Sequence, residues 1–206
     1  MQRIGVLGGT FDPIHYGHLA IAAEVHWALG LTTVYLVPAA HQPLKDTQPR
    51  ASAQQRLEMV RRACADNAAL VASDIELHRP PPSYTVDTLT DLRQQLGVQA
   101  ELWFILGADA LNSLPRWHRI GDLLHVARLV AVKRPGTAPD REALEQTVPG
   151  LRDRLVLLEG PNLEISSSLL RERIAAGRPV RYQLPDSVLA YIQQQQLYGS
   201  SAATSE

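Results

Sequence analysis

The sequence predicts an α/β protein whose central β-sheet is parallel and covered by helices on both faces. Short apolar runs alternate with segments in which apolar residues recur every three or four positions, the pattern of strands alternating with helices. The runs at 4–7, 102–106 and 129–132 carry no polar side chain, as expected of strands that are buried on both faces. A glycine follows the first two of these runs, so each strand would end in a turn.

The individual elements follow from the local pattern. Strands are expected at 4–7, 33–37, within 70–77, and at 102–106, 129–132 and 155–158. Helices are expected at 17–29, from a Ser52 cap to about residue 66, and from 86 to 96, where Gly97 ends the helix. Trp27 and Trp103 have apolar neighbours and are expected in the core.

The C-terminal part of the chain is expected to be helical and smaller than the sheet-bearing part. Ser166 to Ser168 open a helix that Gly177 ends, and a second helix spans 185–197. The fold class is therefore a Rossmann-like, doubly wound parallel sheet with a small C-terminal helical part. We expect one domain over 1–198, with a core at about 1–135 and a C-terminal portion at about 136–198, followed by a flexible tail at 199–206.

The composition excludes several classes of protein. The formal net charge of -1 argues against a nucleic acid as the main partner. No apolar run approaches the roughly 20 residues that span a bilayer, and the N-terminus lacks a signal-peptide pattern. Cys64 is the only cysteine, so neither a disulfide framework nor a cysteine-based zinc site is expected. We expect a cytoplasmic protein with no membrane partner, either a monomer or a small homo-oligomer.

The segment GGTFDPIHYGH, residues 8–18, brings together several residues whose types can bind ligands or take part in catalysis. A zinc site needs at least three protein ligands, and His15 and His18 have no cysteine or carboxylate at ligand spacing to complete one. A dinucleotide loop needs G-x-G-x-x-G and a Walker loop needs Gly-Lys-Ser/Thr, and the segment has neither. A structural tight turn explains the glycines but not two histidines at a helix start.

Binding of a phosphate group explains more of this segment. Gly8 and Gly9 let the backbone approach a ligand and turn its N–H groups toward it, and Thr10 adds a hydroxyl. The helix that starts within the segment favours an anion at its N-terminus. His15 and His18 can donate hydrogen bonds to phosphate oxygens. The segment therefore favours a triphosphate over a metal.

Polar residues also follow other predicted strands. His41 and Lys45 come after the second strand, and Gly107 and Asp109 come after the fourth. Doubly wound sheets bind ligands outside the carboxyl ends of their strands, where the strand order reverses. These residues are therefore expected near the histidines.

The segment at 8–18 resembles the signature of the nucleotidylyltransferase superfamily, whose core motif is His/Thr-x-Gly-His. Four later segments narrow the resemblance to the bacterial nicotinate-nucleotide adenylyltransferases: SYTVDTL (83–89), GADALNSLPRWH (107–118), KRPG (133–136) and ISSSLLRERIAAG (165–177). The resemblance covers residues 1–198, nearly the whole chain. Ser168 stands where the family often has threonine, and this change keeps the hydroxyl.

This resemblance implies an enzyme of NAD biosynthesis. Such enzymes transfer AMP from ATP to nicotinic acid mononucleotide, which gives nicotinic acid adenine dinucleotide and pyrophosphate. The displacement is in line and forms no covalent enzyme intermediate. Mg²⁺ accompanies ATP and takes no ligand from protein side chains. Because the acceptor phosphate is an anion at neutral pH, positioning and charge neutralisation can carry catalysis without a general base.

The resemblance also implies the ATP-binding residues, which would lie in the nucleotide-binding core and the C-terminal portion. His15 and His18 would be the catalytic pair on the ATP phosphates, with His18 stabilising the transition state. The other ATP-binding residues would be Gly8, Gly9, Thr10, Gly107, Asp109, Arg134, Ser167, Ser168 and Arg171. A helix cap remains the alternative for Asp109.

The mononucleotide would be bound by a second group of residues. Trp117 resembles the aromatic residue that stacks on the nicotinate ring, and a pyridinium over an indole is a favourable cation–π pair. The Thr85 hydroxyl and helix-start N–H groups would take the carboxylate. Lys45, His41, Tyr84 and His118 complete the expected set. A core tryptophan is the alternative for Trp117, and solvated loop charges are the alternative for Lys45 and His41.

Three other functions remain open from the sequence. Pantetheine-phosphate adenylyltransferase shares the first motif but lacks a segment like PRWH. Nicotinamide mononucleotide differs from the expected acceptor by one charge, and helix N–H donors should prefer the acid. A nucleotide sensor on the same fold would bind ATP without turnover.

Overall fold

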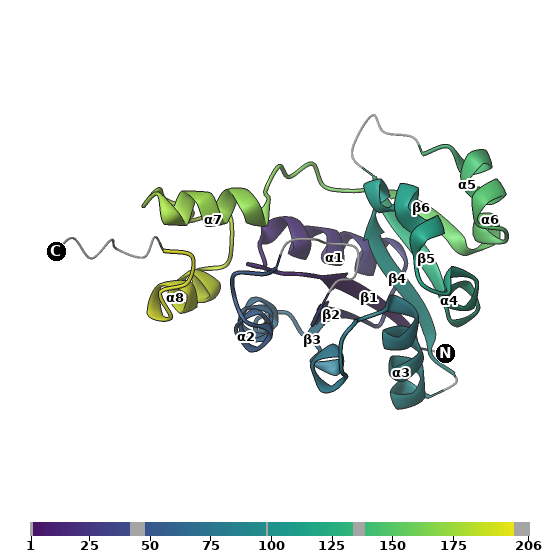
Figure 1. Ribbon diagram of the computed structural model, residues 1–206, viewed down its shortest axis with the longest axis horizontal. Coiled ribbons are helices and arrows are strands. Elements are labelled where there is room, and N and C mark those ends of the chain that lie inside the picture. Colours follow the sequence, from purple (N-terminus) through teal and green to yellow (C-terminus); the bar gives the residue numbers. More distant parts are fainter. Residues whose placement is uncertain (1, 42–47, 98, 134–138, 200–206) are drawn as a thin grey trace.

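The computed structural model describes residues 2–41, 48–97, 99–133 and 139–199. They form a 6-stranded sheet in the order β3-β2-β1-β4-β5-β6, and every neighbouring pair is parallel (Figure 1). The strands are β1 (Arg3–Gly9), β2 (Thr33–Pro38), β3 (Leu70–Ala72), β4 (Glu101–Gly107), β5 (Ala127–Lys133) and β6 (Leu155–Glu159). The strand order reverses between β1 and β4, so the predicted doubly wound sheet is confirmed.

Helices cover both faces of the sheet. One face packs against α1 (Tyr16–Ala28), α2 (Ala53–Cys64) and α8 (Asp186–Gln194), and the other against α3 (Thr85–Leu96) and α4 (Ile120–Val126). Consecutive strand residues divide between these two cores because side chains alternate along a strand. Leu7, Ile105 and Val130 lie in the first core, and Val6, Phe104 and Leu129 lie in the second.

Two serines begin helices as the sequence predicts. The Ser52 hydroxyl accepts a hydrogen bond from the Gln55 N–H, and the Gln55 side chain accepts one from the Ser52 N–H, a reciprocal cap of α2. Ser166 caps α7 (Ser167–Ala175) by accepting from the Leu169 N–H. At Gly97, which ends α3, φ is +89°, a conformation that favours glycine.

The prediction that both Trp27 and Trp103 lie in the core is half wrong. Trp103 is 3% exposed, with the guanidinium groups of Arg3 and Arg128 over its ring. Trp27 is 79% exposed, because α1 turns Ala22 and Val25 toward the sheet. Five positions along a helix place Trp27 on the far side from Ala22.

The remaining helical segments are short. They are η1 (Ile75–His78), η2 (Ala108–Arg116), α5 (Arg141–Thr147) and α6 (Leu151–Arg154), of which η1 and η2 are 3-10 helices. Figure 1 shows α7 and α8 together at one end of the molecule and α5 and α6 at the opposite end. The two-part division of one domain at about residue 135 stays a prediction.

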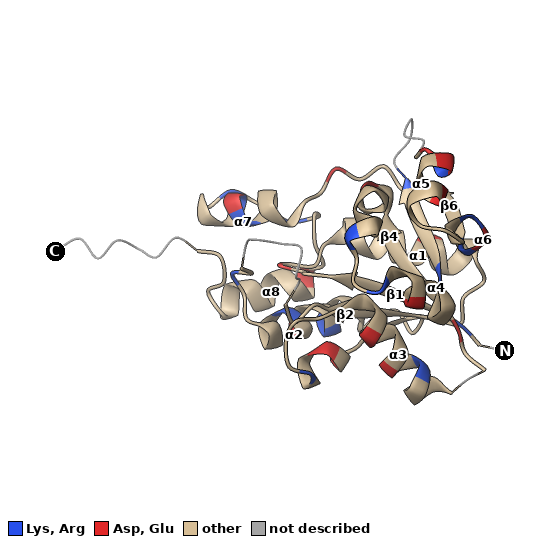
Figure 2. Ribbon diagram, turned by 45° about the vertical axis from the view of Figure 1, so that its right-hand side comes forward, with Lys and Arg blue, Asp and Glu red and all other residues tan. Residues whose placement is uncertain are grey.

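Charged side chains of both signs are spread over the helices. Figure 2 shows Lys and Arg interspersed with Asp and Glu along the helices. Within the described ranges, no helix has the length and apolar content that crossing a membrane requires.

Candidate functional site

The site begins at the carboxyl end of β1, where Gly8 and Gly9 lead into a tight turn. A Cβ atom on Gly9 would lie 2.9 Å from the Phe11 ring, so the turn requires glycine there. The predicted ATP-binding residues Gly8, Gly9 and Thr10 therefore lie beside the point where the strand order reverses. Gly107 ends β4, the neighbour of β1, and lies at the same edge of the sheet.

His15 and His18 lie against each other at the start of α1. Their rings stack with centroids 3.8 Å apart. The His15 backbone N–H donates to His18 Nδ1 at 3.4 Å. A neutral imidazole whose Nδ1 accepts carries its proton on Nε2, so His18 is set up as an Nε2 donor. A Cβ on Gly17 would lie 3.0 Å from His15 Nδ1, which explains the glycine between the histidines.

His15 is a buried histidine. It is 5% exposed, and burial lowers its pKa to about 4. Its Nδ1 has no hydrogen-bond partner among the residues that the structure describes. His15 is therefore neutral at neutral pH and supports His18 through ring contact rather than through charge.

The C-terminal helix α7 reaches the turn between the glycines and the histidines. The Arg171 guanidinium donates to the Asp12 carbonyl at 2.7 Å, and the Ser167 hydroxyl donates to the Pro13 carbonyl at 2.9 Å. The Ser168 hydroxyl accepts from Arg171 at 3.2 Å. Two predicted ATP-binding residues, Ser167 and Arg171, thus contact the segment at 8–18 from more than 150 positions away in the sequence.

A buried arginine that the sequence analysis did not identify braces this end of the site. Arg56 on α2 is 1% exposed, and its guanidinium donates to the carbonyls of Thr10 and Ala39, each at 2.8 Å. It also donates to the Ala51 carbonyl at 3.3 Å. Arg56 therefore joins the turns after β1 and β2. A charged residue within the apolar face of a predicted helix is the signal that could have revealed it.

The turn after β4 carries Asp109 in the first turn of η2, where it is exposed. Gly107 holds the N-cap position of this segment, and no cap hydrogen bond from a side chain is present there. Asp109 is therefore not the N-cap residue of η2, contrary to the alternative role considered for it.

The predicted mononucleotide residues gather at the start of α3. The Ser83 N–H donates to the His41 carbonyl at 3.0 Å, and the His41 N–H donates to the Ser83 hydroxyl at 3.3 Å. Tyr84 is the N-cap residue of α3 and Thr85 its first residue. The Tyr84 ring stacks on His118, with centroids 4.1 Å apart.

Trp117 lies half-buried beside this group, at the end of η2. Its indole N–H donates to the Ser113 hydroxyl at 3.0 Å, and its ring meets the Phe104 ring edge to face at 5.7 Å. These two contacts fix the indole plane while one part of the ring stays accessible. Trp117 is therefore only partly a core residue, since it packs on Phe104 while part of its ring remains exposed.

A buried carboxylate, that of Glu76, braces the mononucleotide end. It accepts from the Ala40 N–H at 3.3 Å and from the Thr88 hydroxyl at 2.7 Å. Thr88 also accepts from Arg79 at 2.8 Å. Glu76 thereby joins the segment before His41 to α3. Glu76 is not among the predicted site residues, since a glutamate in a mixed strand and loop segment has no distinctive pattern.

Two predicted site residues, Lys45 and Arg134, lie outside the described residues, so their roles stay predictions. Within the described ranges, no three His, Cys, Asp or Glu side chains form a group that could hold a metal ion.

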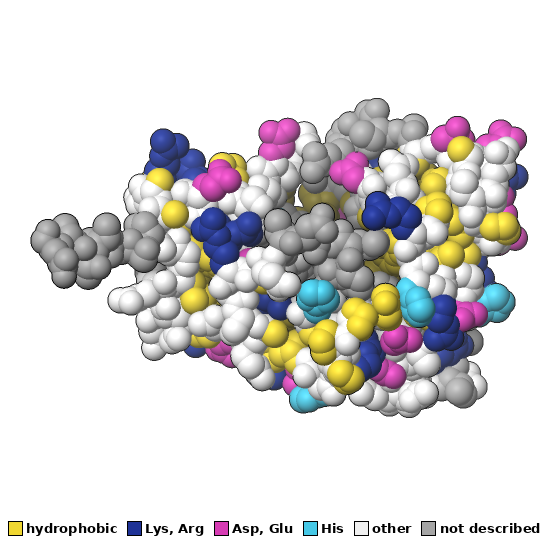
Figure 3. Space-filling model, in the orientation of Figure 1, with side chains coloured by type: hydrophobic (Ala, Val, Ile, Leu, Met, Phe, Trp, Pro, Cys, Tyr) yellow, Lys and Arg dark blue, Asp and Glu magenta, His cyan; other side chains and the backbone are white. Residues whose placement is uncertain are grey.

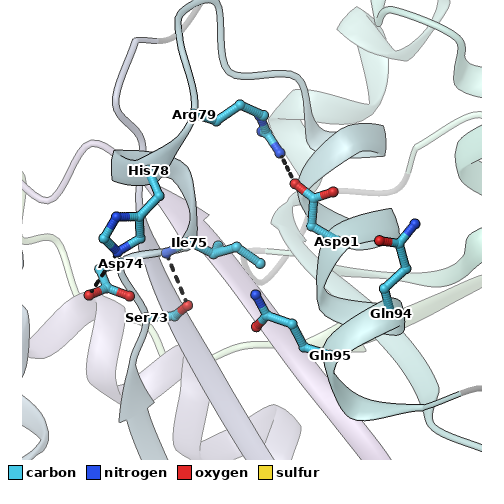
Figure 4. Close-up of a pocket in the computed structure, with 8 residues that line it drawn as sticks. All are labelled: Ser73, Asp74, Ile75, His78, Arg79, Asp91, Gln94 and Gln95. Atoms are coloured by element: carbon cyan, nitrogen blue, oxygen red, sulfur yellow. Dashed lines mark hydrogen bonds and ion pairs between the residues drawn. The ribbon is translucent and has the colours of Figure 1, made fainter.

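A hollow of about 480 Å³ lies between η1 and α3, and none of the predicted site residues lines it (Figure 4). Four of its polar side chains pair with one another: Arg79 with Asp91, and His78 with Asp74. Figure 3 shows another feature of the surface, a face on which histidine and hydrophobic side chains lie together below the centre. Because these side chains of the hollow are already paired, we take the residues at the carboxyl ends of the strands as the candidate site.

Comparison with known proteins finds relatives over nearly the whole chain. The cytidylyltransferase-like family model matches residues 6–173. A relative from Roseiflexus sp. (strain RS-1), named "Probable nicotinate-nucleotide adenylyltransferase", is 55% identical over 95% of this chain and 97% of its own length. One of the same name from Herpetosiphon aurantiacus is 49% identical over 96% of this chain and 99% of its own.

The chain belongs to the nicotinate-nucleotide adenylyltransferase family. The resemblance seen in the sequence is thus confirmed over almost the full length.

A solved structure from a distant relative shares the fold of this family member. "Plasmodium falciparum nicotinic acid mononucleotide adenylyltransferase complexed with NaAD" superposes with a TM-score of 0.77 at 20% identity, covering 96% of this chain and 98% of the other. A second structure of that protein, complexed with APC, gives a TM-score of 0.75.

Proposed function

We propose that this chain transfers AMP from ATP to nicotinic acid mononucleotide, forming nicotinic acid adenine dinucleotide and pyrophosphate in NAD biosynthesis. The observation that carries the proposal is the pairing of two unlike groups at the carboxyl ends of the strands. The histidine pair and Arg171 surround the turn after β1, and an aromatic group lies at α3 and η2. The names and high identity of the bacterial relatives support the same activity.

The phosphate group would react at the histidine end. An oxygen of the mononucleotide phosphate forms a bond to the α-phosphorus of ATP, and the bond to the bridging oxygen of the leaving group breaks. The electron pair of that bond leaves with pyrophosphate. His18 donates through Nε2 to the phosphate oxygens that gain charge, and Arg171 adds a full positive charge nearby. The attacking oxygen is already ionised, so the chain's residues need only position and neutralise.

Magnesium would enter with ATP in this mechanism. The carboxylate within the segment at 8–18 belongs to Asp12, and both of its oxygens accept hydrogen bonds from protein donors. The side chains of His15, His18, Ser167 and Arg171 would meet the phosphates with imidazole, hydroxyl and guanidinium groups, a donor set that suits phosphate oxygens rather than Mg²⁺. The ion would be held by those phosphate oxygens, where it neutralises the charge of the leaving pyrophosphate.

The mononucleotide would bind at the aromatic end. The nicotinate ring carries a positive charge, and the accessible part of the Trp117 indole offers it a cation–π contact. Thr85, at the N-terminus of the 12-residue helix α3, offers a hydroxyl and backbone N–H groups to the carboxylate. Because unpaired donors are costly, this end should favour a carboxylate over a carboxamide.

The test is pyrophosphate release with Mg²⁺-ATP and each of three acceptors: nicotinic acid mononucleotide, nicotinamide mononucleotide and phosphopantetheine. Strong preference for the first supports both ends of the proposed site. Preference for either of the others contradicts the assignment of the aromatic end. ATP binding without turnover on any of them would indicate a sensor.

A further inference from the structure

The Asp12 side chain is a junction between the two ends of the polypeptide. It is 3% exposed, and its carboxylate accepts from the backbone N–H of Arg50 at 2.8 Å and of Ala51 at 3.1 Å. Its third hydrogen bond comes from the Tyr198 hydroxyl at 2.7 Å, across 186 positions of sequence. Hydrogen bonds to an ionised group are the strong ones in proteins, so this contact is well suited to fix the turn.

The turn that carries Asp12 also carries the phosphate-binding groups. The main-chain carbonyl of Asp12 accepts a hydrogen bond from Arg171, whose guanidinium also lies 3.8 Å from the Asp12 carboxylate. The next carbonyl along accepts from Ser167. A shift of the Asp12 carboxylate would therefore move the anchor of Arg171 and the approach to His15 together.

We propose that Tyr198 is a positioning residue for the ATP phosphates, acting through the Asp12 carboxylate on Arg171 and the histidine pair. This role deepens the adenylyltransferase function and rests on it. The Tyr198 hydroxyl donates to the Asp12 carboxylate, so its influence on the phosphate-binding groups would pass through the turn.

The Tyr198 hydroxyl has the properties that such a role needs. The side chain is buried, and burial together with the Asp12 hydrogen bond raises the pKa of the phenol. The hydroxyl therefore remains a proton donor across the working pH range. The backbone at Tyr198 has φ of 64°, a left-handed conformation uncommon for a residue other than glycine. The chain after α8 thus adopts an unfavourable conformation that places this side chain against Asp12.

Docking of the C-terminal helix has separate supports. The Ser187 hydroxyl donates to the Arg62 carbonyl at 3.1 Å, and the Arg62 guanidinium lies 4.8 Å from the centre of the Tyr191 ring. Val188 and Ile192 are buried in the core that α1 and α2 share. Removal of the Tyr198 hydroxyl alone should therefore leave α8 in place.

The test compares Tyr198→Phe with Tyr191→Phe, the same substitution in the same C-terminal part. For each variant we would measure kcat, the KM for ATP, the KM for nicotinic acid mononucleotide and the Tm. Tyr198→Phe should lower kcat/KM for ATP by roughly tenfold, the loss expected for one hydrogen bond to a charged group. The KM for the mononucleotide should change less than about twofold, because Asp12 does not reach the aromatic end. Tyr191→Phe should match the unmodified protein in every kinetic constant.

A double-mutant cycle with Asp12→Asn tests whether the hydroxyl acts through that carboxylate. In the Asp12→Asn background, Tyr198→Phe should cost clearly less than it does alone. Equal losses in both backgrounds would overturn the proposed route. Unchanged kcat/KM for ATP in Tyr198→Phe, or a lower Tm with an equal rise in both KM values, would leave Tyr198 with a structural role only.

Binding of Mg²⁺-ATP, measured by calorimetry on the full chain, separates this inference from the proposed function. If the unmodified protein binds ATP but does not use nicotinic acid mononucleotide, the acceptor assignment fails. Tyr198→Phe must still weaken ATP binding for the positioning role to stand. Absence of ATP binding by the unmodified protein would overturn both proposals.

Discussion

The phosphate end and the mononucleotide end of the site are each braced by one buried carboxylate, but they present their functional groups differently. At the phosphate end Asp12 holds a turn, and the groups beside it are polar and hydrogen-bonded, including the Arg171 guanidinium. At the mononucleotide end Glu76 holds the backbone, and the groups beside it are aromatic: Tyr84 stacks on His118, and Trp117 meets Phe104 edge to face.

This difference follows from the two ligands that we propose. A triphosphate is recognised by charge and by donors held in fixed positions, because charge stabilisation depends on donors that need no reorganisation. A flat heterocycle is recognised by ring faces, where contact area matters more than the placement of single atoms. Loss of one group should therefore affect turnover at the phosphate end and affinity at the mononucleotide end.

The largest effect should come from His18→Ala. It removes the Nε2 donor that we place on the phosphates, so kcat should fall on the order of 10²–10³-fold with the Tm unchanged. His26→Ala, at the other end of α1, is the matched control and should keep normal turnover. Near-normal kcat for His18→Ala would remove this histidine from the proposed mechanism.

Arg56→Met should lower the stability of the protein more than it lowers the use of the mononucleotide. The carbonyls of Thr10 and Ala39 would lose their buried donor, and Asp12 would lose a nearby positive charge. We expect the free energy of unfolding to fall by about 3 kcal/mol in urea titration. Arg61→Met on the same helix removes a solvent-exposed ion pair and should change stability by no more than about 0.5 kcal/mol. Equal losses in the two variants would contradict the bracing role of Arg56.

Stability should decrease as the pH falls below about 6.5, because the pKa of His15 is near 4 in the folded chain and near 6.5 unfolded. In that window the unfolded chain binds a proton that the folded chain does not. The contribution of neutral His15 is fully present above the unfolded pKa and is lost as the pH falls through the folded one. A loss on the order of 2 kcal/mol is expected from denaturant titrations between these pH values.

His15→Gln isolates this effect from the titration of other groups. Its side chain stays neutral, so its stability should depend less on pH than that of the unmodified protein. The same pH dependence in both proteins would show that His15 titrates normally.

Trp117→Ala should have the smallest effect and should act on the acceptor. Loss of one ring face should raise the KM for nicotinic acid mononucleotide by roughly tenfold and leave the KM for ATP within about twofold. Trp27→Ala removes the same side chain from an exposed position and should leave both constants unchanged. A Trp117→Ala effect confined to ATP would mean that the two ends of the site are assigned wrongly.

Much of the fold could be predicted because its signals are local. The apolar strands, the caps at Ser52 and Ser166 and the end of α3 at Gly97 each depend on a few neighbouring residues. The predicted phosphate segment and Gly107 also lie at the carboxyl ends of adjacent strands, where the rule for doubly wound sheets places them. The short helices α4, α5 and α6 were missed because four to seven residues contain too few turns to show a period.

The errors and omissions have one physical origin. The prediction of a core position for Trp27 fails because an apolar helix permits more than one orientation of its buried face, and only packing against the sheet selects one. Arg56 and Glu76 are charged residues whose burial depends on partners from other segments.

The sequence by itself determined the parallel sheet and the family. These properties rest on residue type and on spacing within short stretches, which a linear chain displays directly. Tertiary structure alone decided that Arg171 meets Asp12, that Tyr84 stacks on His118 and that Tyr198 closes the turn. Those contacts join segments far apart in the chain, and their partners are set by the packing of helices on the sheet rather than by any local pattern.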